Sequence, residues 1–226
     1  MPTYEQLGFG QGAALTGDRA RAVFGHVMGL VACALGFAAL GAYIARNLNG
    51  ADWFLFFIGG FACIMALNYA SARGREQLAV GLLFGGGLLL GMAISQVVVY
   101  YAKTDSGAVW DAAGATGLFV GLLGSIGYAT RRDLTGILRP LMIAFIPVFL
   151  FGLIALFVAI PGANVIYCVL MLVIFGGFTL FDFNRLARNP SYTSTVPIAA
   201  RIFLDIFNVF LLLLSLFGGG GRFGRR

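Results

Sequence analysis

The chain is a series of long apolar runs separated by short polar connections. Each run is near 20 residues, which is the length that an α-helix needs to cross a bilayer. Because the connections are short, we expect no soluble domain between the runs. The pattern predicts an all-α integral membrane protein with seven transmembrane helices. The predicted spans lie at about residues 22–45, 52–72, 78–102, 109–129, 138–160, 163–184 and 197–217.

The composition agrees with a membrane protein. The chain has 226 residues, of which 60% are hydrophobic and only 11% are charged, and its mean hydropathy is +0.92. Soluble domains carry about 25% charged residues, so this chain lacks the charge to cover a water-facing surface. We expect a cytoplasmic N-terminal tail over residues 1–21, a transmembrane domain over residues 22–217, and a flexible basic C-terminal tail over residues 218–226.

Small residues recur at four-residue intervals in two of the runs. The third run contains GLLFGGGLLLG and the fourth contains GATGLFVGLLGSIG. Small side chains at this spacing let helix backbones approach closely. We interpret both stretches as plain helix packing.

The basic residues are distributed unevenly among the connections. Ten lie on the side of the N-terminus and two on the opposite side, which by the positive-inside rule places the N-terminus in the cytoplasm. This distribution explains the net charge of +6, so the charge does not indicate nucleic-acid binding. Three further arginines in the C-terminal tail would lie on the opposite side if all seven runs cross. The ten are Arg19, Arg21, Arg73, Arg75, Arg131, Arg132, Arg139, Arg185, Arg188 and Arg201; the two are Arg46 and Lys103.

The cysteines and the single histidine do not predict a metal or cofactor site. Cys33, Cys63 and Cys168 each lie inside an apolar run with no partner at metal-binding spacing. We interpret them as small buried thiols. His26, at the start of the first run, is interpreted as an interfacial residue, and no cofactor is expected.

Two aspartates stand apart from the other acidic residues. Asp182 lies near the end of the sixth run and Asp205 about two turns into the seventh, both among apolar side chains. A charged aspartate near the middle of a membrane helix costs about 2.5–3.5 kcal/mol, so such residues usually face the bundle and have partners. On the same helices, Arg185 follows Asp182 by three residues, Arg201 precedes Asp205 by four, and Asn208 follows it by three.

These aspartates allow two interpretations. In the first, each one forms a static ion pair with the arginine of its own helix, Asp182 with Arg185 and Asp205 with Arg201. In the second, the two carboxyl groups meet and share a proton, because two adjacent carboxylates cannot easily both ionise. A pair of this kind responds to pH. It would also attract Ca²⁺, which selects carboxylate and carbonyl oxygens.

The stretches TLFDFNRL, ARIFLDIFNVFLLLLSLFG and GYATRRDLTGI resemble the Bax-inhibitor family of transmembrane proteins. The resemblance covers nearly the whole chain. It implies a seven-helix bundle with the last helix at its centre and a pH-sensitive calcium leak, in a bacterial inner membrane. It further implies that Asp182 and Asp205 form the pH sensor and that Arg75, or Arg73, is a latch between them. In this chain Arg201 lies one turn from Asp205 and could compete for it.

Other functions remain as alternatives. Intramembrane aspartyl proteases also use two membrane aspartates, but in YD and GxGD motifs that are absent around Asp182 and Asp205, so we do not predict an enzyme. A proton/cation exchanger is one alternative. A regulatory membrane protein that modulates membrane proteolysis or a stress response without transport is another. The expected partners are the bilayer, Ca²⁺ and protons.

Overall fold

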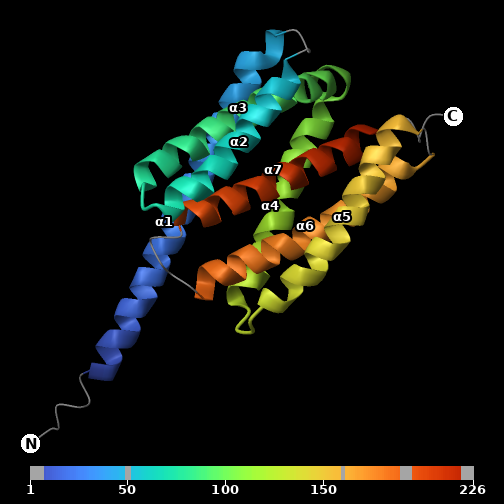
Figure 1. Ribbon diagram of the computed structural model, residues 1–226. Helices are drawn as coiled ribbons and strands as arrows, with labels where there is room; N and C mark the ends of the chain where they lie inside the picture. Colours follow the sequence, from blue (N-terminus) through green and yellow to red (C-terminus); the bar gives the residue numbers. More distant parts are fainter. Residues whose placement is uncertain (1–7, 49–51, 159–160, 189–194, 220–226) are drawn as a thin grey trace, which may run out of the picture.

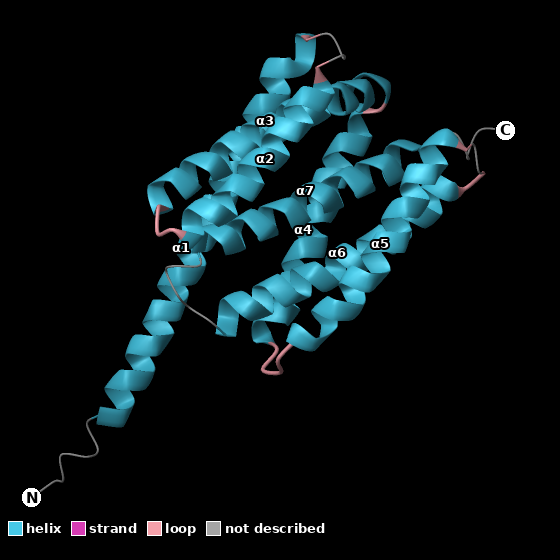
Figure 2. Cartoon of the chain, viewed as in Figure 1, coloured by secondary structure: helices cyan, strands magenta, loops and turns pink. Residues whose placement is uncertain are grey.

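The computed structural model describes residues 8–48, 52–158, 161–188 and 195–219, with no side-chain description for residues 8–19, 156 and 219. Within these ranges the chain forms seven α-helices and one short 3₁₀ segment (Figures 1 and 2). The helices satisfy their own backbone groups, as a chain in hydrocarbon requires. They are α1 (Gly8–Ile44), η2 (Ala45–Asn47), α2 (Trp53–Ala72), α3 (Glu76–Thr104), α4 (Ser106–Ala129), α5 (Thr135–Phe157), α6 (Ala163–Arg188) and α7 (Thr195–Gly219).

The helix α7 lies at the centre of the bundle. On one side α1 and α2 pack on α3, and on the other α4 and α5 pack on α6. Figure 1 shows α7 running between these two groups, and it contacts α1, α2, α3, α4 and α6. Five of its residues are completely buried: Ala199, Ile202, Phe203, Val209 and Leu214. The central position of the last helix is thereby confirmed.

All seven helices are long and apolar enough to cross a membrane within the described part of the chain. The predicted number and order of spans are therefore confirmed, and their limits agree within a few residues. One difference concerns α1, which begins at Gly8 inside the predicted N-terminal tail and projects beyond the bundle in Figure 1. The predicted C-terminal tail lies almost wholly outside the described residues.

Glycines bring α3 close to α1. A Cβ atom on Gly87 would meet the carbonyl oxygen of Ala34 at 2.8 Å, and one on Gly91 would overlap that of Ala38. The four-residue spacing of both pairs matches one turn of each helix. The packing interpretation of the third span is therefore confirmed for Gly87 and Gly91, whereas a Cβ atom on Gly81 or Gly85 would meet no atom within 4 Å.

Candidate functional site

The two membrane aspartates meet across α6 and α7. These helices pack against each other and are joined by residues 189–194. The depth of Asp182 and the depth of Asp205 are therefore both measured from the end of the bundle where this connection lies. Asp182 lies about 9 Å from the end of α6 and Asp205 about 15 Å from the start of α7, at 1.5 Å per residue. Their residues are 5% and 6% exposed, and their carboxyl groups are in hydrogen-bonding contact. The structure thus brings together the two residues that the sequence singled out.

The residues that flank the two aspartates along their helices are buried and apolar. On α6, Asp182 stands between Phe181 and Phe183, each 6% exposed, and on α7 Asp205 follows the fully buried Ile202 and Phe203. Water has little access to such a site, and electrostatic interactions there are stronger than in solvent. A net charge left on the pair is therefore costly to bury at this position.

An arginine from the opposite helix approaches the pair. Nη1 of Arg201 on α7 lies 3.9 Å from Oδ1 of Asp182 on α6. This is an ion-pair distance, but it is too long for a hydrogen bond. Oδ1 of Asp182 and Oδ2 of Asp205 are accordingly buried without a hydrogen-bond partner. Arg185 is the second cation acting on Asp182.

The ion pair between Arg201 and Asp182 differs from the two static ion pairs that the sequence suggested as the first interpretation. That arrangement paired Asp205 with Arg201 within α7 and Asp182 with Arg185 within α6. The described pair instead crosses from α7 to α6. The charge of Arg201 also acts on Asp205, so one arginine serves both carboxyl groups.

Three other predicted residues make contacts elsewhere. Arg75 is exposed at the N-cap of α3, and the guanidinium of Arg73 stacks over the ring of Tyr69 at 4.2 Å. Neither arginine forms an ion pair with a residue that the structure describes. Asn208 is half-buried, and its amide donates to the carbonyl of Leu204 at 2.7 Å within α7.

Asn184 is a site residue that sequence reasoning missed. It follows Asp182 by two residues, is 2% exposed, and binds the connection between α4 and α5. Its Nδ2 group donates to the carbonyls of Gly127 at 3.2 Å, Thr130 at 2.8 Å and Arg132 at 3.2 Å. Its Oδ1 accepts from the backbone N–H of Leu134 at 3.3 Å. The signal was present in the sequence, because a polar side chain so close to Asp182 in an apolar helix requires partners.

Arg188 and Asp133 also hold the end of α6 against the connection between α4 and α5. Nη1 of Arg188 donates to the carbonyl of Arg131 at 3.0 Å, and its Nη2 lies 4.0 Å from Oδ2 of Asp133. Asp133 accepts from both the hydroxyl and the backbone N–H of Thr135. The hydroxyl of Thr135 is the main cause that holds the pKa of Asp133 below its ordinary value. The end of α6 that carries Asp182 is thus tied to the α4–α5 connection.

Comparison with known proteins places this architecture in one family. The family model described as "Inhibitor of apoptosis-promoting Bax1" matches residues 20–222. An uncharacterized protein of Chlamydia muridarum is 31% identical over 234 residues, covering 94% of this chain and 95% of that protein. An uncharacterized protein of Helicobacter pylori is 28% identical over 165 residues, 73% and 70% of the two chains.

An uncharacterized membrane protein of Streptococcus pyogenes serotype M1 is 27% identical over 156 residues, which covers 66% of this chain and 67% of that protein. The description of that relative as a membrane protein agrees with the seven helices that are long and apolar enough to cross a membrane. Because the family model matches nearly the whole chain, the protein belongs to the Bax-inhibitor family of multi-pass membrane proteins.

Proposed function

We propose that this protein is a pH-sensitive calcium leak channel whose gate is the pair of Asp182 and Asp205. The observation that carries the proposal is the pair itself, two buried carboxyl groups in contact across the packed helices α6 and α7. Two adjacent carboxylates repel each other, so the buried pair is stable when it shares one proton. In this proposal, the number of protons that the pair holds determines whether α6 and α7 stay packed together and the channel stays closed.

The charge balance supports this gate. With one shared proton the pair carries one negative charge, which the nearby Arg201 neutralises. A near-neutral cluster can be buried at a tolerable cost, whereas an additional unpaired charge in an apolar site cannot. Loss of the shared proton therefore favours a conformation in which water or a cation reaches the carboxylates.

The chemistry of the site favours Ca²⁺ as cargo. Asp182, Asp205 and the side-chain oxygen of Asn208 are hard oxygen donors, which suit Ca²⁺ better than softer metals. Ca²⁺ takes about 6–8 oxygen ligands, and two carboxyl groups supply at most four. Within the described residues there is no cluster of three or more His, Cys, Asp or Glu side chains that could hold a metal. We therefore propose that the ion passes the pair and does not reside there.

The arginine that neutralises the pair is, in this proposal, Arg201. It makes the described ion pair, whereas Arg75 and Arg73 lie at the start of α3 and the end of α2. The latch role of Arg75 or Arg73 stays a prediction from the family resemblance. Arg201→Gln and Arg75→Gln, compared in the same flux assay, distinguish the two: we expect the larger change in pH response from Arg201→Gln.

The proposal is tested with purified protein in liposomes that contain a calcium indicator. We expect Ca²⁺ entry above that of empty vesicles, with a rate that changes between pH 6 and 8. A proton/cation exchanger would instead move protons in fixed ratio to Ca²⁺, which a second, pH-sensitive dye measures. No Ca²⁺ entry above empty vesicles at any pH in this range would contradict the proposal and favour a regulatory role without transport.

A further inference from the structure

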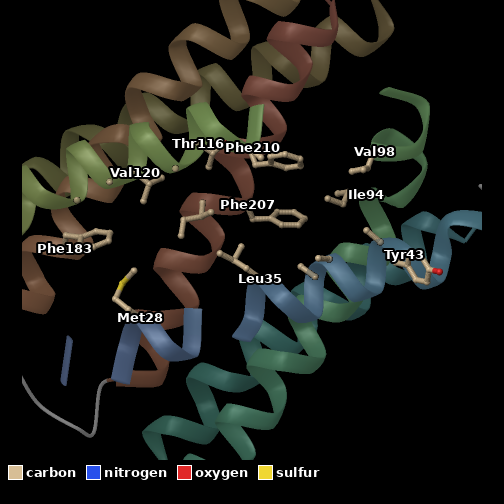
Figure 3. A pocket seen from close by; sticks show the side chains of 18 of the residues that line it. Met28, Leu35, Tyr43, Ile94, Val98, Thr116, Val120, Phe183, Phe207 and Phe210 are labelled. Atoms are coloured by element: carbon tan, nitrogen blue, oxygen red, sulfur yellow. The ribbon is translucent and has the colours of Figure 1, made fainter. Parts of the chain in front are cut away.

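A long groove lies between α1 and α4. It has a volume of about 1070 Å³, just above the roughly 300–1,000 Å³ found for ligand pockets. Figure 3 shows Phe207 and Phe210 of α7 at its floor, with α1 and α4 on either side. At one end the rings of Phe24 and Tyr128 meet, with centroids 5.0 Å apart.

The groove exists because α4 presents small residues on this side. A Cβ atom on Gly117 or Gly121 would meet no atom within 4 Å. On the same helix, a Cβ on Gly124 would touch the ring of Phe183 at 3.0 Å, and one on Gly127 would overlap the backbone of Leu180. The packing interpretation of the fourth-span glycines is therefore wrong for Gly117 and Gly121, which line an open groove.

The size and lining of the groove fit the hydrocarbon of a bilayer. From Phe24 to Ile44, α1 rises about 30 Å at 1.5 Å per residue, and Arg46 follows in η2. This length matches the roughly 30 Å of a hydrocarbon core, of which the acyl chain of one leaflet occupies about half. Most lining residues are apolar, and Arg46 is the one charged residue among the described lining side chains. Apolar cavities do not hold water well, and an empty groove would forfeit dispersion contacts along its walls. A hydrocarbon chain supplies those contacts.

Arg46 at the other end provides a charge for a headgroup. It is exposed, forms no ion pair with a described residue, and has the ring of Tyr43 4.0 Å from its guanidinium carbon. The end of α1 is fixed on α3, because Ser95 donates to the carbonyl of Ala42 at 2.9 Å and Gln96 to that of Leu48 at 2.7 Å. Arg46 therefore lines the groove on a fixed stretch of backbone, and guanidinium groups bind phosphate in a two-pronged geometry.

We propose that this groove binds a membrane phospholipid, with an acyl chain between α1 and α4 and its phosphate at Arg46. The occupant is a lipid of the leaflet at the Arg46 end, opposite to the end that carries Asp182 and Asp205. The proposal is independent of calcium transport. The bound chain lies against Phe207, two residues from Asp205, so the lipid contacts the helix that carries one half of the aspartate pair.

The acyl chain is tested by photo-crosslinking in vesicles made with a phospholipid that carries a diazirine in its chain. Bulk lipid reaches Leu118 and Leu122 of α4, which are 69% and 65% exposed, but not Phe207, which is 7% exposed. We expect cross-links at Phe207 and Phe210 as well as at the two leucines. Cross-links at the leucines alone would overturn the proposal.

Filling the groove provides the matched comparison. Gly117→Leu combined with Gly121→Leu should remove the cross-links at Phe207 and keep those at Leu118. Gly114→Leu is the control, because Gly114 also has no atom within 4 Å of a Cβ but does not line the groove. If the filled variant keeps the wild-type cross-links at Phe207, the chain does not lie in the groove.

The headgroup is tested by native mass spectrometry with two lipids of the same chains, a phospholipid and a diacylglycerol. Arg46→Gln should reduce the phospholipid adducts and leave the diacylglycerol adducts unchanged. Lys103→Gln, which removes the other cation predicted at this end, should change neither. Equal phospholipid binding by Arg46→Gln and Lys103→Gln would overturn the role of Arg46, and this readout does not depend on the filled variant being able to fold.

Discussion

Removal of the Asn184 amide should loosen the connection between α4 and α5. In Asn184→Ala, three carbonyl oxygens and the backbone N–H of Leu134 lose their side-chain partner. A typical intramolecular hydrogen bond contributes about 0.5–1.5 kcal/mol net. Four such bonds at a residue that is 2% exposed give an expected loss of about 2–6 kcal/mol.

Asn68→Ala is the matched control. The amide of Asn68 makes one described hydrogen bond, to the carbonyl of Ile64 one turn earlier in α2, so its loss should cost about 1 kcal/mol or less. The free energy of unfolding is measured by titration with a denaturing detergent in mixed micelles. Hydrogen exchange at the amide of Leu134 supplies a local readout, and it should become faster in Asn184→Ala only.

Two results would refute this reasoning. One is a loss of stability in Asn184→Ala no larger than in Asn68→Ala. The other is unchanged exchange at Leu134, which would mean that the connection is held by the Arg188 contacts instead.

Three further predictions concern packing, pH and topology. Gly127→Ala should destabilise the protein through overlap with the α6 backbone, by about 1–3 kcal/mol, whereas Gly121→Ala should be tolerated; equal effects in the same unfolding titration would contradict the assigned contacts. Asp133 should titrate below its ordinary pKa in a carbon-detected NMR titration. Its contribution to stability is then present above the pKa of the unfolded state and is lost as pH falls through the lower pKa of the folded state. An ordinary or raised pKa of Asp133 would refute this prediction. Cysteine-accessibility labelling should place positions near Arg131 on the cytoplasmic side and near Lys103 outside, and labelling of both from one side would exclude the predicted topology.

The spans were predictable because the bilayer imposes helix length and apolar composition on each of them. The meeting of Asp182 and Asp205 was also predictable, because a short connection joins their helices at the same end. The cross-helix approach of Arg201 was not, since the four-residue spacing points to Asp205 and the rotation of α7 depends on its neighbours. Pairing across a bundle is a tertiary property that spacing within one helix does not report.

The glycines illustrate the same limit. The third and fourth spans carry similar stripes of small residues, yet Gly91 of α3 packs against α1 and Gly121 of α4 faces a groove. The spacing of small residues fixes where a helix can be approached closely. It does not say whether another helix is there.

The central claim is that Asp182 and Asp205 act as one proton-sharing gate. It is tested most directly by Ca²⁺ flux into liposomes from pH 6 to 8 with Asp182→Asn, Asp205→Asn and the double variant. Each single change removes the shared proton, so both should flatten the pH dependence, and the double change should add little to either because residues that act as a unit are not additive. If either single variant keeps the full wild-type pH response, the two carboxyl groups do not form the gate.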